Sequence, residues 1–281
     1  MKHILLPTDF SDNSWNAITY AISLFKEEVC TFYFLNTYTP VVYRVDSIMG
    51  STSQLGLADA LRQTSLNGLN QINDKLSETF GANPKHAYKM LSRFNYLVSG
   101  IKEFLSKNET DLVVMGTQGA TGAKEVLFGS NTVQVFNDIK CPVMAIPEGC
   151  EYEKPSEILF PTDLQVDFNS FQLDILKHIA STNQSKVHGL HVSMGAEMTR
   201  QQKENKAELE TQFSDTSFVF HHYKSMPVTA AIDKFQTSAK LNVLAMINNK
   251  RSFFENIFFK STINQLGFHI HLPFLVIPAK D

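Results

Sequence analysis

The chain contains two phrases that each occur twice, and this repeat constrains the fold more than any other feature. The segment His-Ile-Leu-Leu-Pro-Thr-Asp-Phe at 3–10 recurs as Glu-Ile-Leu-Phe-Pro-Thr-Asp-Leu at 157–164. The segment at 141–147, Cys-Pro-Val-Met-Ala-Ile-Pro, recurs in the same way at 272–278. Each half therefore begins and ends alike, which indicates two copies of one structural unit.

Within each half, strand-like apolar runs alternate with helix-like ones. At 55–80, apolar residues recur close to the 3.6-residue period of a helix. Alternation of this kind implies a parallel sheet with helices on both faces. We therefore predict an α/β protein of two domains, 1–148 and 155–281, joined by a polar stretch that contains Gly and Pro. Strands are expected near 3–7, 29–36, 86–91, 111–115 and 142–146, helices near 12–27, 55–80, 96–107 and 129–138, and the strands of the second half near 157–161, 186–192, 217–222, 241–246 and 273–277.

Composition excludes several classes of protein. With 43% hydrophobic residues in 281, a sizeable core can be buried. A net charge of −3 argues against a general nucleic-acid or membrane-surface binder. No apolar run approaches the ~18 residues of a membrane span, and the first residues lack the apolar length of a signal peptide. The three cysteines fit reduced thiols, so we expect a cytoplasmic protein.

A glycine pattern lies between an expected strand and an expected helix. The apolar run 111–115 is followed by Gly116-Thr117-Gln118-Gly119, nine further residues, and Gly129-Ser130. Glycine lets backbone N–H groups approach an anion, and a helix N-terminus adds unpaired donors and partial positive charge. The pattern therefore predicts a phosphate site, although glycines after a strand also serve as a simple turn. Gly122 is read as loop flexibility, and Lys124 as either a phosphate partner or a solvated lysine.

Asp9 ends the first expected strand, and ligands of open parallel sheets bind beyond such strand ends. If the first and fourth strands are neighbours, Asp9 and the glycine loop face one crevice. An ionised carboxylate only accepts hydrogen bonds, so Asp9 suits a ribose hydroxyl or an adenine amino group rather than a phosphate. The alternative is that Asp9, with Ser11, caps the following helix. The second strand is expected to end near Asn36 and Thr37, whose backbone is expected to line the base pocket.

These residues resemble the universal stress protein family. The resemblance rests on Ile-Leu-Leu-Pro-Thr-Asp-Phe-Ser at 4–11 and on the spacing Gly-x-x-Gly-(nine)-Gly-Ser, and it covers the chain as two tandem copies. It implies a Rossmann-like, adenine nucleotide alpha hydrolase-like fold with a five-stranded parallel sheet, dimerisation through the last strand, and ATP, alone or with Mg²⁺, as the ligand. It implies Gly116, Gly119, Gly129 and Ser130 at the phosphates, with Asn131 and Thr132 beside them, and Asp9 and Thr37 at the adenosine. The nucleotide-binding set we expect is Pro7, Thr8, Asp9, Thr37, Met115, Gly116, Thr117, Gln118, Gly119, Gly129, Ser130, Asn131 and Thr132.

The second copy departs from this pattern. Alignment of Phe-Gly-Ser at 128–130 with Phe-Lys-Ser at 259–261 places Ile247, Lys250 and Lys260 where the first copy has glycines. Side chains there block the close backbone approach that phosphates need, so we expect one nucleotide per chain. The alternative is that Lys250, Arg251 and Lys260 bind an anion through their side chains. We expect the second copy to supply a dimer-like partner surface, with 142–146 meeting 273–277 in one chain, and a further homodimer stays open.

Other patterns carry little chemistry. His188 and His191 lie three residues apart on one expected strand, and His221 and His222 are adjacent on the next. Both spacings point the two side chains of a pair to opposite faces, so a shared metal is not expected. No metalloprotease, Cys-x-x-Cys or nucleophile-elbow pattern occurs. The sequence favours a non-catalytic, ATP-binding protein of the stress response. The alternatives are a slow ATP hydrolase or phosphotransferase on the same scaffold, and a nucleotide-free scaffold that recruits a protein partner.

Overall fold

The computed structural model describes residues 1–39, 51–117, 128–171, 173–193, 195, 197–248 and 271–278. The chain divides into two compact units, Met1–Ile139 and Lys140–Asp281. Each unit is an α/β structure built on parallel strands, so the predicted fold class is confirmed. All three cysteines are free thiols.

The strands of the first unit follow the order β3-β2-β1-β4 and are parallel. The central strand β1 has β2 on one side and β4 on the other, so the direction of strand succession reverses at the β1–β4 pair. Its apolar residues Ile4, Leu5 and Leu6 are completely buried because helices cover both faces. The strands are β1 (Lys2–Pro7), β2 (Cys30–Tyr38), β3 (His86–Phe94) and β4 (Leu112–Gly116).

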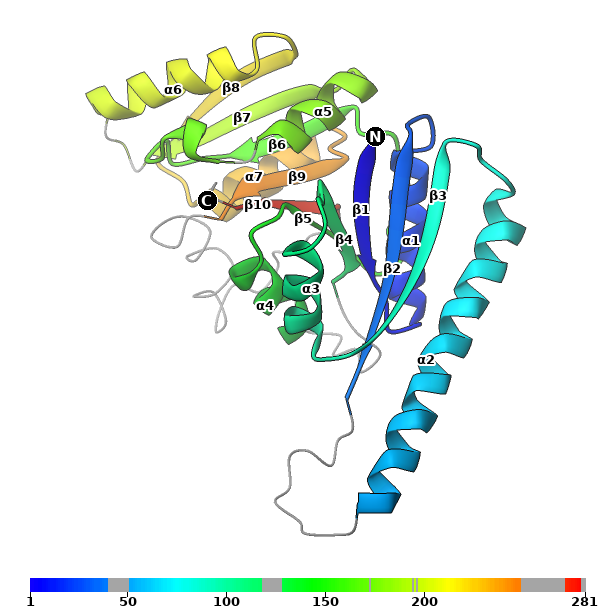
Figure 1. Ribbon diagram of the computed structural model, residues 1–281. Helices are drawn as coiled ribbons and strands as arrows, with labels where there is room; N and C mark the ends of the chain where they lie inside the picture. The colour runs from blue at the N-terminus through cyan, green and yellow to red at the C-terminus, as the bar shows by residue number, and fades with distance from the viewer. Residues whose placement is uncertain are drawn as a thin grey trace. The chain divides into compact units, whose positions relative to one another are not determined.

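The helices of the first unit cover the sheet as right-handed crossovers require. The two that connect β1 to β2 and β2 to β3 lie on one face, and the two that follow β3 and β4 lie on the other (Figure 1). Leu69, Ile72 and Leu76 form the buried stripe of the long second helix at helical spacing. The helices are α1 (Asp12–Leu24), α2 (Ser51–Phe80), α3 (Leu97–Leu105) and α4 (Ser130–Asp138).

The second unit repeats this arrangement and adds one antiparallel pair. Its strand order is β5-β10-β9-β6-β7-β8, in which β5 pairs antiparallel with β10 and the other pairs are parallel. The strand β8 therefore stands at the end of the order. The elements are β5 (Val143–Ile146), β6 (Glu157–Pro161), the short 3-10 helix η2 (Phe168–Ser170), α5 (Asp174–Asn183), β7 (Lys186–Ser193), α6 (Arg200–Gln212), β8 (Ser217–Lys224), α7 (Val228–Ser238), β9 (Val243–Ile247) and β10 (Phe274–Ile277).

Sequence periodicity placed the elements correctly, with boundaries that differ by a few residues. Every predicted strand is present, and β2 and β3 each run two or three residues further than expected, to Tyr38 and Phe94. The segment 147–156 contains no helix or strand, as expected for a connection. The strand β5 precedes this segment yet clusters with the second unit, because its backbone pairs with β10. None of the described helices has the length and apolarity needed to span a bilayer.

Candidate functional site

The strand order brings the two halves of the expected site to one edge of the sheet. Strand β1 pairs directly with β4, with Ile4 opposite Leu112 and Leu5 opposite Val113. The adjacency on which the sequence argument depended is therefore confirmed. Because the two strands are parallel, the chain leaves both of them at the same edge, where the order reverses and ligands of such sheets bind.

The chain leaves β1 through a tight turn held by neighbouring side chains. Phe10 adopts a left-handed conformation with φ of 66°, which a non-glycine residue accepts only where the surroundings enforce it. Its N–H donates to Thr8 Oγ1 at 3.1 Å, and the Asn36 amide donates to the Thr8 carbonyl at 2.7 Å. Asn36, at the end of β2, thus fixes the turn rather than standing open to a ligand.

Asp9 is exposed at the outside of this turn. Its Oδ1 accepts from the Ser11 N–H at 3.1 Å and from the Ser11 hydroxyl at 2.6 Å. Ser11 is the N-cap of α1, and its side chain accepts from the Ser14 N–H at 3.2 Å. The cap function predicted as an alternative for Asp9 and Ser11 therefore belongs to Ser11, and Asp9 orients it. Asp9 keeps an exposed position at the sheet edge.

Close packing against Asn13 explains why a glycine stands at position 116. A Cβ atom added there would lie 2.7 Å from Asn13 Nδ2, 2.8 Å from Asn13 Cγ and 3.2 Å from the Asn13 carbonyl oxygen. Real Cβ atoms do not approach other heavy atoms so closely, so glycine lets β4 end against the first turn of α1. Sequence reasoning considered a phosphate contact or a turn and missed Asn13, because only the strand order reveals that these segments meet.

Buried threonines tie the end of β4 to the start of α4. The hydroxyl of Thr132 is buried and donates to the carbonyl oxygens of Gly116 at 3.2 Å and Thr117 at 3.0 Å. The Gly129 N–H donates to the Thr117 carbonyl at 2.8 Å. These bonds use the Thr132 hydroxyl proton and the Gly129 N–H inside the protein, so both groups position the helix start.

The first turn of α4 offers donors at the same edge. Gly129 is the N-cap, and glycine has no side chain that could cap the helix start. The first N–H groups of a helix lack intrahelical acceptors and carry partial positive charge. Ser130 and Asn131, the first two residues of α4, are exposed. A helix start of this kind is suited to an anion.

The remaining predicted residues fall into two groups. Pro7 and Met115 are buried at the ends of β1 and β4, and Thr37 is half-buried near the end of β2. The Thr37 methyl would lie 2.7 Å from a Cβ added at Gly100, so α3 packs closely on it. Gln118 and Gly119, together with Gly122 and Lys124, lie outside the described residues.

The second unit contains the same turn in a different setting. Leu164 has φ of 57°, its N–H donates to Thr162 Oγ1 at 3.0 Å, and Asp163 Oδ1 accepts from the Gln165 N–H at 2.9 Å. Here α6 hydrogen-bonds to the turn: the Gln202 amide donates to the Asp163 carbonyl at 3.0 Å and the Asn205 amide to the Leu164 carbonyl at 2.9 Å. In the first unit, Gly68 of α2 packs against the Phe10 ring instead. Ile247 ends β9, whereas Lys250 and Lys260 lie outside the described residues.

A family model for the universal stress protein family matches residues 1–147. The chain belongs to the universal stress protein family. It is 30% identical over 148 residues to universal stress protein MJ0531 of Methanocaldococcus jannaschii, an alignment that covers 52% of this chain and 81% of that protein.

Two solved structures match the whole chain in fold. A universal stress protein from Archaeoglobus fulgidus aligns with a TM-score of 0.66 at 18% identity, covering 99% of this chain and 97% of the other. A protein described as a putative universal stress protein from Pseudomonas aeruginosa aligns with a TM-score of 0.57 at 11% identity, covering 100% of this chain and 94% of the other. Full-length matches of this kind support a Rossmann-like fold.

Proposed function

We propose that the first unit binds one ATP molecule and that the protein acts as a non-catalytic, nucleotide-binding member of its family in the stress response. The observation that carries the proposal is the start of α4, where a glycine N-cap and the exposed residues Ser130 and Asn131 stand at the reversal point of the strand order. The family spacing of glycines at 116–130 supports the same assignment.

Different residues are assigned to the phosphates and to the adenosine of ATP. Ser130 and Asn131 hold phosphate oxygens through the first turn of α4, together with Gly119 of the glycine loop. Gly116, Thr117, Gly129 and Thr132 shape the helix start through their own packing and hydrogen bonds. Asp9 accepts from the ribose or the adenine amino group, while Thr37, Pro7 and Met115 line the adenosine end.

The same reasoning assigns no nucleotide to the second unit. In that unit α6 donates to the Asp163 and Leu164 carbonyls of the turn after β6, and Ile247 stands where the first unit has the glycine that ends β4. We further propose that the β5–β10 pairing takes the place of the contact through which single copies dimerise. The free thiols of Cys30, Cys141 and Cys150 favour a reducing compartment and hence the cytoplasm.

Titration calorimetry with ATP and Mg²⁺ tests the proposal by comparing two variants, each of which lacks the aspartate in the turn of one unit. Asp9→Ala removes a charged acceptor beside the ligand and should weaken ATP binding about tenfold, since a hydrogen bond to a charged group contributes roughly 1.5 kcal/mol. Asp163→Ala alters the same turn in the second unit and should leave the affinity unchanged. The stoichiometry should be one nucleotide per chain; two would refute the assignment of Ile247 and α6.

Substitution of the loop glycine separates the competing functions. Gly119→Lys should abolish ATP binding with the fold intact, because its side chain occupies the space of a phosphate. An ATP hydrolase would instead show turnover by the wild-type protein that this variant lacks. A nucleotide-free scaffold would show no thermal shift with ATP, whereas a binder at 100 times its Kd gains ~2.7 kcal/mol of stability.

A further inference from the structure

The terminal strand β8 of the second unit has adjacent histidines that meet β7 on both faces of the sheet. His221 lies on the face covered by α7, where it contacts Phe235, and His222 lies on the opposite face. Each meets a histidine of β7: His221 bonds to His188, and the His222 ring lies against the His191 ring at a tilt of 36°. We call these two pairs the histidine clasp of β8.

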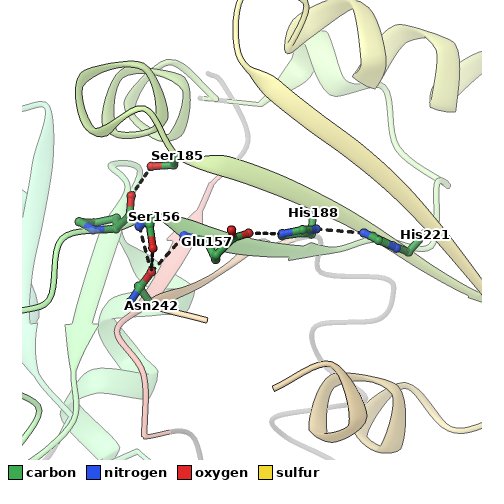
Figure 2. Close-up of polar contacts among 7 residues, drawn as sticks. Ser156, Glu157, Ser185, His188, His221 and Asn242 are labelled. Carbon is green, nitrogen blue, oxygen red and sulfur yellow. Dashed lines mark hydrogen bonds and ion pairs between the residues drawn. The ribbon is translucent and has the colours of Figure 1, made fainter. Parts of the chain in front are cut away.

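On the α7 face the clasp forms a continuous chain of hydrogen bonds that ends in a carboxylate. Figure 2 shows Glu157 of β6 bonded to His188 Nε2, and His188 Nδ1 facing His221 Nε2 at 3.0 Å. Phe235 packs on both imidazole rings, with centroids 4.9 Å from His188 and 5.0 Å from His221. His188 is almost completely buried, at 7% exposure.

The chemistry of this chain requires an acceptor between the two rings. A carboxylate oxygen accepts, so His188 Nε2 donates to Glu157; of His188 Nδ1 and His221 Nε2, one nitrogen donates and the other accepts, and the tautomer decides which. A pair in which both rings are doubly protonated has no acceptor, so it loses the bond between the strands. The nitrogens face each other, and among the described residues no three His, Cys, Asp or Glu side chains gather as a metal site.

On the other face the clasp holds the end of β7. His222 Nε2 and Ser193 Oγ share a hydrogen bond of 2.9 Å, and the ring centroids of His191 and His222 are 5.3 Å apart. His191 is buried at 3% exposure, and its Nδ1 donates to the Thr162 carbonyl at 2.9 Å. Charging His222 therefore brings a cation against a buried ring that is fixed in place.

The surroundings of both β8 histidines disfavour their charged forms. Burial lowers the pKa of His221 below its ordinary 6.5, and His188 and Lys186 lower it further. Burial also lowers the pKa of His222, aided by His191 and Lys224 and opposed by Glu197. Two other lysines packed on these faces have partners: Lys234 lies over the Tyr223 ring, and Lys206 lies over the Phe220 ring and pairs with Glu210. Asp233, a carboxyl group of α7, has its pKa raised by burial.

The sign of the effect follows from these pKa values. The unfolded chain takes up protons on His221 and His222 near pH 6.5, whereas the folded protein takes them up only at lower pH. Their contribution to stability is therefore fully present above about pH 6.5 and is lost as pH falls through the folded values.

The first unit supplies an internal reference strand. Strand registers align Leu5, Tyr33 and Lys89 in the first unit with Leu159, His188 and Val219 in the second. Counting along β3 and β8 from that alignment, His221 corresponds to Leu91 and His222 to Ser92, neither of which titrates near neutral pH. Strand β3 therefore keeps the same topology as β8 without its clasp.

We propose that the histidine clasp makes β8 a pH-responsive strand, held to β7 at neutral pH and released by mild acid while the first unit stays folded. Every residue of the clasp belongs to the second unit, so this pH response does not require nucleotide binding.

Hydrogen exchange of the full chain tests this directly. Protection factors, corrected for intrinsic exchange, are compared for β8 and β3 between pH 7.5 and 5.5. Protection of β8 should fall by up to about tenfold per pH unit for each histidine, and that of β3 should fall much less. Equal losses in the two strands, or none in β8, would overturn the proposal using the wild-type protein alone.

Variants assign the loss to the clasp. His221→Leu with His222→Ser introduces the residues of β3 and should remove most of the acid-dependent loss in β8. If that protein does not fold, the separate variants His221→Gln and His222→Gln should each remove part of it. His271→Gln, at an exposed histidine outside the strands, is the matched control and should behave as wild type. A β8 that still opens in acid without His221 and His222 would contradict the assignment.

Discussion

Replacing Gly116 by valine is expected to lower the free energy of unfolding of the first unit by about 2 kcal/mol, as overpacking of a tight contact does. The Cβ atom alone would lie 2.7 Å from Asn13 Nδ2 and 3.2 Å from the Asn13 carbonyl oxygen. The side chain can shift but the backbone oxygen is fixed by α1, so β4 and α1 must separate. Urea unfolding followed by the fluorescence of Trp15, the single tryptophan and a residue of α1, measures the effect.

Gly56 provides the control for this substitution. It lies in α2, is exposed, and a Cβ added there meets nothing within 4 Å. Gly56→Ala should leave stability unchanged or raise it by up to about 1 kcal/mol, since alanine favours a helix over glycine. Asn13→Ala combined with Gly116→Val should recover part of the loss, because neighbouring substitutions couple. An unchanged midpoint for Gly116→Val would show that the close approach is absent.

The Gly116 contact illustrates where sequence reasoning stops. The alternation of apolar periods was enough to predict every strand and to place Asp9 and Gly116 at strand ends, because those features are local. That Asn13 fills the space beside Gly116 depends on β1 and β4 being neighbours, which no local pattern contains. The sequence could offer a phosphate or a turn as the reason for the glycine, and the packing reason needed three dimensions.

The histidines of the second unit show the same limit of prediction from local sequence patterns. Strand periodicity correctly predicted that His188 and His191 point to opposite faces, as do His221 and His222, and this argued against a metal. It could not predict that the two strands are neighbours and in a register that joins His188 to His221. The histidines of β7 indicate nothing by themselves. Their contacts with His221 and His222 become evident only when β8 is placed beside β7.

Replacing Asn242 by alanine is expected to destabilise the second unit by about 3 kcal/mol, because each buried group left without a partner costs roughly 1–3 kcal/mol. Its Oδ1 accepts from the Ser156 N–H at 2.9 Å, the Ser156 hydroxyl at 2.7 Å and the Glu157 N–H at 3.0 Å (Figure 2). Asn242 is buried at 6% exposure, so water cannot replace these bonds without opening the start of β6. Thermal unfolding followed by circular dichroism, with hydrogen exchange at β6, measures the loss.

The first unit indicates which substitution should be tolerated. The corresponding residue there is Asp111, whose N–H bonds to the His3 carbonyl as that of Asn242 bonds to Glu157, both at 2.9 Å. Asp111 accepts from the His3 N–H at 2.7 Å, so a carboxylate performs the same task. Asn242→Asp should therefore keep the acceptors for Ser156 and lose only the 3.1 Å bond to Glu153, with like-charge repulsion beside it. We expect this variant to lose less stability than Asn242→Ala, and a loss as large as that of alanine would show that the shared acceptor is not what holds the start of β6.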